Sequence, residues 1–336
     1  MKEVIELDMS IMNLVKKTFP FIITRLLVYG LFGLIALLFL GIMVGIGFFL
    51  IKAFGETGGA FIVVMIIAFG VIYGGLKFLE KYVLYMVKIG HVSAIVELMR
   101  NGELPEGKGM VAYGKDQVTQ NFGSSNVAFV LDKMVYAAVR QIQRWIMRIG
   151  NIFNFIPGAN SIIGIINAIM SVSLNYIDEA IMSYIFLRKS EEKEETVWKS
   201  AADGVVLYAQ SWKGIIKSAI GSVVFIYAFN IIVFLILVFP LMLVGKLIAS
   251  DTPGLGLFLG FLAIVAAYVL TTVLKRAFID PVVTIMMVRS YQMSIRDLEP
   301  SIDLQQKLLG VSSRFKRLFN KAEEEEQANI PPVAQS

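Results

Sequence analysis

Four long runs of apolar residues without a charged side chain constrain the fold of this 336-residue chain more than any other feature. A helix needs about 20 apolar residues to cross the hydrocarbon core of a bilayer. The first run extends from Leu26 to Ile51, and the second from Ala60 to Leu76. The third extends from Ser218 to Gly245, and the fourth from Pro253 to Leu274. We therefore expect an all-α polytopic membrane protein with four transmembrane helices.

The composition argues against several classes of protein. Hydrophobic residues make up 57% of the chain and charged residues only 17%, whereas soluble domains are nearer to about one half and about one quarter. The chain has no cysteine and one histidine, His91, which excludes disulfides and thiolate sites and argues against a catalytic zinc or iron site. No phosphate-binding loop or nucleophile motif is present. We therefore expect neither an enzyme nor a bound metal or cofactor.

The distribution of basic residues predicts the orientation of the chain. The turns at Phe54–Gly59 and Ser250–Gly256 are short and almost uncharged, whereas most lysines and arginines lie beyond the other ends of the apolar runs. Basic residues accumulate on the cytoplasmic side of membrane proteins. Both turns are therefore expected outside a multi-pass plasma-membrane protein, with both termini in the cytoplasm. The net charge of +5 then reflects cytoplasmic loops and not nucleic-acid binding.

The two halves of the chain share one pattern. Each half has an amphipathic stretch, an apolar run, a glycine-bearing turn, a second run and a helix that ends near Leu-Pro or Glu-Pro. This pattern predicts two parallel-repeat hairpins, although any two hydrophobic hairpins look alike. We expect the hairpins at 1–105 and 201–300, a central cytoplasmic-side segment at 106–200, and an amphipathic basic tail at 301–336 whose end, from Glu323–Glu326 onward, is disordered.

A fifth apolar block, Ile149–Ile177, carries no charge but is interrupted by Pro157-Gly158. A single crossing here would move the later basic residues to the outer side, against the usual rule. The block is therefore expected to form a re-entrant or interfacial segment between the hairpins, with the Pro-Gly pair as its turn.

Three acidic residues are candidates for binding an ion or a substrate. Asp280 precedes Pro281 beyond the fourth run, and a carboxylate beside a kink could bind a cation or a substrate amine. The alternative is an ion pair with Lys275 or Arg276. Asp178 and Glu179 lie together in an otherwise apolar helix, where two acids are costly unless they are paired or hydrated.

One helix face predicts the partners of that acidic pair. It is formed by residues spaced seven, four and four apart, namely Lys133, Arg140, Arg144 and Arg148. This basic face could neutralise Asp178 and Glu179, or it could contact anionic lipid on the cytoplasmic side.

Glycines in the apolar runs, with Pro281, are candidates for helix packing or hinge motion. The candidates are Gly41, Gly45, Gly256 and Gly260, and the spacing of the first two permits close helix approach. His91 lies on the helix that continues the second run. We expect it at the surface, at headgroup level.

The segment from about Trp198 to Leu318 resembles the C-terminal part of choline transporter-like proteins. The resemblance rests on WKSAADGVVLYAQSWKGIIKSAIGSVV, a span ending LMLVGKLI, a short turn, a final span, AFIDPVVTIMMVRSYQ and a KLLG tail, with NYIDEAIMSYIF before it. The chain is shorter than typical members and lacks their cysteine-rich external loop. The resemblance implies choline transport, with an acid in the last span at Asp280.

Two functions remain open at this point. The resemblance favours a transporter or channel for a small solute, such as an organic cation, with Asp280, Asp178 and Glu179 as its coordinating acids. The scarcity of polar residues inside the four runs favours a non-transporting membrane scaffold or assembly protein. Such a protein would be homo-oligomeric and would bind membrane lipid or a partner on its cytoplasmic face.

Overall fold

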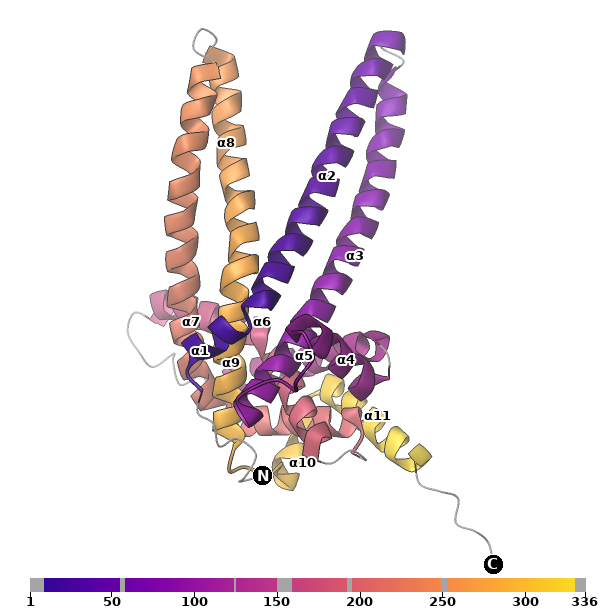
Figure 1. The fold of residues 1–336 in the computed structure, drawn as a ribbon, viewed down its shortest axis with the longest axis vertical. Helices are drawn as coiled ribbons and strands as arrows, with labels where there is room; N and C mark the ends of the chain where they lie inside the picture. Colours follow the sequence, from indigo (N-terminus) through magenta and orange to yellow (C-terminus); the bar gives the residue numbers. More distant parts are fainter. Residues whose placement is uncertain are drawn as a thin grey trace, which may run out of the picture.

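The apolar runs form the outer parts of two long helical hairpins that project from the same side of a helical body (Figure 1). The first hairpin consists of α2 (Phe19–Phe54) and α3 (Gly58–Asn101). The second consists of α7 (Val197–Ile248) and α8 (Pro253–Leu274). This computed structural model describes residues 9–54, 58–123, 125–149, 159–191, 195–248 and 253–329, which are almost entirely helical and include no strand.

The body gathers the remaining helices around the lower halves of α3 and α7. A helix rises about 1.5 Å per residue, so the 52 residues of α7 extend well beyond one bilayer crossing. The other elements are α1 (Ile11–Lys17), α4 (Met110–Phe122), α5 (Ser125–Ile149), α6 (Ala159–Glu191), the π-helical turn η3 (Lys275–Ile279), α9 (Asp280–Ile295), α10 (Ile302–Val311) and α11 (Ser313–Asn329).

Two helical stretches in the described part of the chain are long and apolar enough to cross a membrane, Gly74–Asn101 and Ser218–Leu247. A third results if α1 and Phe19–Ile35, which are bent by 60°, count as one span. In the first stretch 67% of the most apolar 18-residue segment is buried, whereas in the second only 17% of the corresponding segment is buried. Lower α3 is thus a core helix of the body, and α7 presents apolar side chains outward. These helices are compatible with a membrane protein, and the four predicted spans stay a prediction.

Large apolar side chains are exposed along both hairpins. Contiguous exposed apolar surface of this kind is typical of contact with lipid or with another protein. The side chains that are more than half exposed include Leu27, Leu34, Leu38, Ile42 and Val71 in the first hairpin and Val224, Ile236, Phe239, Leu247 and Tyr268 in the second. Figure 1 shows the two hairpins separating as they leave the body.

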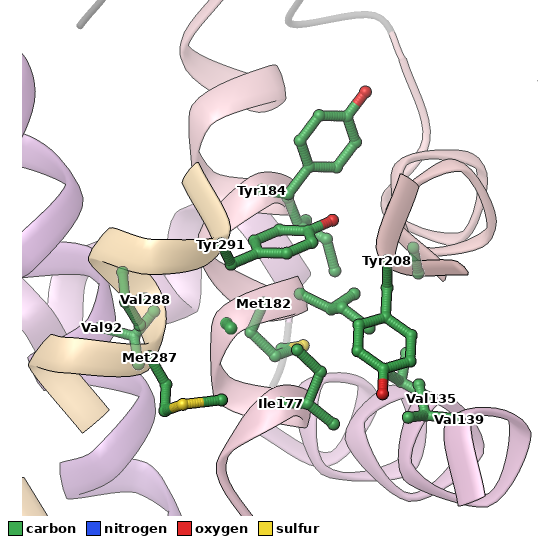
Figure 2. Close-up of a cluster of buried hydrophobic side chains, with 14 of the residues drawn as sticks. Val92, Val135, Val139, Ile177, Met182, Tyr184, Tyr208, Met287, Val288 and Tyr291 are labelled. Carbon is green, nitrogen blue, oxygen red and sulfur yellow. The ribbon is translucent and has the colours of Figure 1, made fainter. Parts of the chain in front are cut away.

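The hydrophobic core lies in the body, where α3, α5, α6, α7 and α9 meet. Figure 2 shows this cluster, with Ile177 and Met182 of α6 between side chains of the other helices. Two buried hydroxyls in it are satisfied, as buried tyrosines require. The Tyr291 hydroxyl donates to the carbonyl of Gly204 at 2.8 Å, and the Gln143 amide donates to the Tyr208 hydroxyl at 2.8 Å.

The C-terminal tail belongs to the body. The side chains of Leu308, Phe315 and Leu318 are fully buried, and α11 packs against α5 and α7. The hydroxyl of Ser312 accepts from the backbone N–H of Phe315 at 3.1 Å, which caps the first turn of α11. The prediction that Glu323–Glu326 are disordered is wrong, because α11 continues through them to its end.

The structure describes the fifth apolar block from Ala159 onward. The predicted turn at Pro157-Gly158 lies in 150–158, outside the described residues. From Ala159 onward the block forms one continuous helix, α6, which Figure 1 places where the hairpins meet the body.

Close helix contact in the body depends on a glycine pair that the sequence patterns did not single out. A Cβ atom on Gly114 of α4 would lie 2.6 Å from the carbonyl oxygen of Gly90 on α3. By contrast, a Cβ atom on Gly260 would meet nothing within 4 Å. The surroundings of Gly41, Gly45 and Gly256 lie outside the described side chains, so the packing role of these glycines stays a prediction.

Gly114→Ala is expected to lower the free energy of unfolding by about 2 kcal/mol, because the added methyl group pushes α4 away from α3. Gly74→Ala is the matched control, since a Cβ atom there meets nothing within 4 Å, and a helix-interior alanine gains about 0.5–1 kcal/mol over glycine. Equilibrium unfolding in detergent micelles measures the free energy of unfolding of both variants. Equal stability of the two variants would contradict the close crossing.

Candidate functional site

A charged cavity of 490 Å³ lies at the base of the first hairpin, where α2, α3, α5, α6 and η3 meet. We call it the junction cavity. Its volume falls within the range of about 300–1,000 Å³ that is usual for small-molecule sites. Its walls carry five basic and four acidic side chains, namely Lys77, Lys81, Lys88, Lys133 and Arg276, and Glu80, Asp132, Asp178 and Glu179.

The periodicity of α3 places its charges on the cavity wall. The apolar run ends at Leu76, and Lys77, Glu80, Lys81 and Lys88 follow at spacings of three, one and seven. These spacings keep Lys77, Lys81 and Lys88 on one face of the helix. Lys77 and Glu80 form an ion pair at 2.6 Å. The cavity therefore begins at the level where the apolar part of the hairpin ends.

An ion pair between α3 and α6 forms the floor of the junction cavity. Lys88 pairs with Glu179, whose side chain is 1% exposed, and the hydroxyl of Thr284 on α9 also donates to Glu179. The expectation that α5 supplies the partner of Glu179 is therefore wrong. α5 contributes Lys133 to the cavity wall, but the cation at Glu179 comes from the first hairpin.

Asp178 is buried without a cation of its own. Its side chain accepts a hydrogen bond from the backbone N–H of Glu179 at 3.0 Å, and it pairs with no basic side chain in the described part of the chain. Burial, followed by the negative charge of Asp132, raises the pKa of Asp178 well above its ordinary value. Burial also raises the pKa of Asp132, despite its ion pair with Lys133 at 2.9 Å. Two such acids side by side favour a bound proton or cation.

Asp280 lies outside the walls of the junction cavity, in a hydrogen-bonded group of its own. Its carboxylate pairs with Lys275 at 2.7 Å and accepts from the Tyr176 hydroxyl at 2.6 Å. Burial and the neighbouring Asp280 carboxylate raise the pKa of Tyr176. The structure thus shows the ion-pair alternative expected for Asp280, and a binding role for Asp280 stays a prediction.

Pro281 is accommodated by a wider helical turn. It lies in the first turn of α9, directly after η3. Because proline has no backbone N–H, a carbonyl upstream loses its usual partner. The Asp280 N–H donates to the carbonyl of Lys275, five residues before it, as in a π-helix. Such π-helical turns often occur at functional sites. Here the turn sets the direction in which Asp280 and Thr284 enter the body.

His91 is fully buried, so the prediction that it lies at the surface is wrong. Its Nδ1 atom is 3.2 Å from Nη2 of Arg25, and its ring stacks on Phe21 with centroids 5.1 Å apart. Arg25 is itself 2% exposed. The surface prediction was wrong because α3 runs on into the body instead of lying along a membrane surface.

The remaining members of the predicted basic face do not line the junction cavity. Arg140 and Arg144 are exposed on α5, and the side chain of Arg148 lies outside the described side chains. No three His, Asp or Glu side chains come together in the described ranges in a way that could hold a metal ion. The cavity therefore offers ionic and hydrogen-bonding groups, with both signs of charge.

Comparison with known proteins gives no relative for this chain. No protein-family model matches it, and neither a curated protein nor a solved structure matches it. The proposed function therefore depends on the hairpins and the junction cavity alone.

Lys88→Met is expected to lower the free energy of unfolding by about 3 kcal/mol, because it leaves the buried Glu179 carboxylate without its cation. Glu179→Gln is expected to cost less than about 1.5 kcal/mol, since glutamine still accepts from Thr284 and the lysine can turn into the cavity. Equilibrium unfolding in mixed micelles compares the two variants. Lys81→Gln, at an exposed position on the same helix, is the control and should unfold like the wild type.

Proposed function

We propose that this chain is a non-transporting membrane scaffold that anchors its helical body through two hairpins and assembles with further copies of itself. The observation that carries the proposal is twofold: the hairpins separate as they leave the body (Figure 1), and many of their large apolar side chains are exposed. In a single copy these surfaces have only lipid to contact. Association with another copy would cover them.

Four spans and a parallel repeat fit this architecture. Both hairpins project from the same side of the body. On the side of the body, the apolar runs are bounded by basic residues: Arg25 precedes the first run, Lys77 follows the second, and Lys275 follows the fourth. By the distribution of basic residues, the body lies in the cytoplasm and the hairpin tips lie outside. The apolar lengths of the four helices support this arrangement.

The separation of the hairpins also argues against transport by one copy. A carrier or channel needs a polar path that protein encloses on all sides. The main contacts between the hairpins join α2 to α8 and to η3, near the body. Beyond that level the described helices of one copy separate, and their outward side chains are apolar.

Transport of a small solute is the second candidate, and the junction cavity favours it. An organic cation could be held by Asp178 and Glu179 and passed to Asp280, which α9 places near Thr284 and the floor of the cavity. This mechanism requires a path between hairpins of neighbouring copies. It therefore also depends on assembly, but it makes Asp280 essential.

Reconstitution in vesicles separates the two functions. The scaffold proposal predicts dimers or larger assemblies in lipid nanodiscs, measured by mass photometry, and choline and potassium fluxes equal to those of empty vesicles. A monomer at every protein-to-lipid ratio would contradict the scaffold proposal. A choline flux that Asp280→Asn abolishes, with assembly unchanged, would instead establish transport. Lys307→Gln, exposed on α10, is the control for the Asp280 variant.

A further inference from the structure

We propose that the junction cavity holds the headgroup of a phospholipid with a primary ammonium group, of the phosphatidylethanolamine class, whose acyl chains lie against the first hairpin. The inference depends on the proposed position of the hairpins in the bilayer, and it does not depend on assembly.

The depth of the cavity matches the headgroup layer. Its wall includes Lys77, the first charged residue after the apolar run of α3, and Arg276, which lies two residues after the apolar run of α8. Tyr29, one turn beyond Arg25 on α2, also lines it. Three helices therefore change from apolar to charged at the level of this cavity. In a bilayer that is the level of the phosphate and amine groups.

One acid of the acidic wall, Asp178, has no cation paired with it in the described part of the chain. Asp178 is 7% exposed and lines the cavity, and its side chain accepts a hydrogen bond from the backbone N–H of Glu179. Asp132, 2% exposed, lies beside it and has Lys133 as its partner. A primary ammonium has three N–H donors, so it could bond to both carboxylates at once. Its charge would offset the negative charge that burial makes costly here.

The basic wall has two cations without a partner in the described part of the chain. Lys81 and Arg276 both line the cavity, and both are exposed. Neither forms a hydrogen bond or ion pair with another described residue. A lipid phosphate bound between them would accept charge-assisted hydrogen bonds, which are the strong ones in proteins. An occupant with an ammonium and a phosphate therefore pairs with the charged side chains of both walls, whereas a simple cation or anion pairs with those of one wall.

The rim of the cavity identifies a lipid and not a free solute. Phe78 is 63% exposed and packs edge-on against Phe129, with ring centroids 6.5 Å apart. Both rings line the cavity. An aromatic pair with the exposed ring of Phe78 and the partly buried ring of Phe129 suits the glycerol and first methylene groups of a lipid. A soluble phosphoethanolamine would leave this apolar surface uncovered.

The test measures lipid retention by the full-length protein. The protein is reconstituted in vesicles with equal amounts of phosphatidylethanolamine and phosphatidylcholine and is then extracted in mild detergent. Native mass spectrometry counts the lipids that remain bound. The wild type should retain phosphatidylethanolamine over phosphatidylcholine by about tenfold or more, because the quaternary ammonium of choline has no N–H to donate to Asp178.

Variants of the two walls should act differently. Asp178→Asn should reduce the preference to near equality, since it removes the charge that selects the ammonium. Lys81→Gln and Arg276→Gln should reduce the retention of both lipids by a similar factor, because the two lipids share the phosphate. Asp303→Asn and Lys307→Gln, matched changes at exposed positions of α10, should keep the wild-type count and ratio.

Three results would overturn the inference. The first is equal retention of the two lipids by the wild type, which needs no variant and no assumption about folding. The second is an unchanged preference in a folded Asp178→Asn protein. The third is displacement of the lipid by millimolar free phosphoethanolamine, which would assign the cavity to a soluble solute. Because each oligomer is counted separately by mass, a monomer that keeps the lipid preference would contradict the scaffold proposal and leave this inference standing.

Discussion

The ion pair between Lys88 and Glu179 is the interaction on which the rest of the structure depends. It joins the first hairpin to α6, and the Thr284 hydroxyl ties the same carboxylate to α9. A carboxylate with 1% exposure is stable only with such partners. The pair therefore fixes how the hairpin leaves the body, and that direction determines both the junction cavity and the separation of the two hairpins.

The sequence was sufficient for the features that depend on a local pattern. The uncharged runs predict long apolar helices, and the acids at Asp178 and Glu179 stand out because apolar helices rarely contain them. The partner of Glu179 depends on how helices that lie far apart in the chain pack together. The spacing of basic residues on α5 therefore predicted the wrong cations. The burial of His91 was missed for the same reason, because α3 has the same periodicity in a protein core as on a membrane surface.

The glycines show a further limit of sequence patterns. Gly41-x-x-x-Gly45 matches a motif of close helix approach, whereas neither Gly90 nor Gly114 has a glycine four residues away in its own helix. Yet it is the second pair that lies at a close crossing, because the contact joins two different helices. The chain thus divides into apolar outer helices, whose positions local patterns predict, and a body whose polar contacts are set by tertiary packing.

The proposed topology requires that both hairpin tips lie on one side of the membrane and the body on the other. Because the chain has no cysteine, single cysteines at Gly58, Gly254 and Ser313 can be tested one at a time with a membrane-impermeant thiol reagent on intact cells. Gly58→Cys and Gly254→Cys are expected to react, and Ser313→Cys is expected to react only after the membrane is opened. Reaction at only one of the two tips in intact cells would contradict the shared direction of the hairpins.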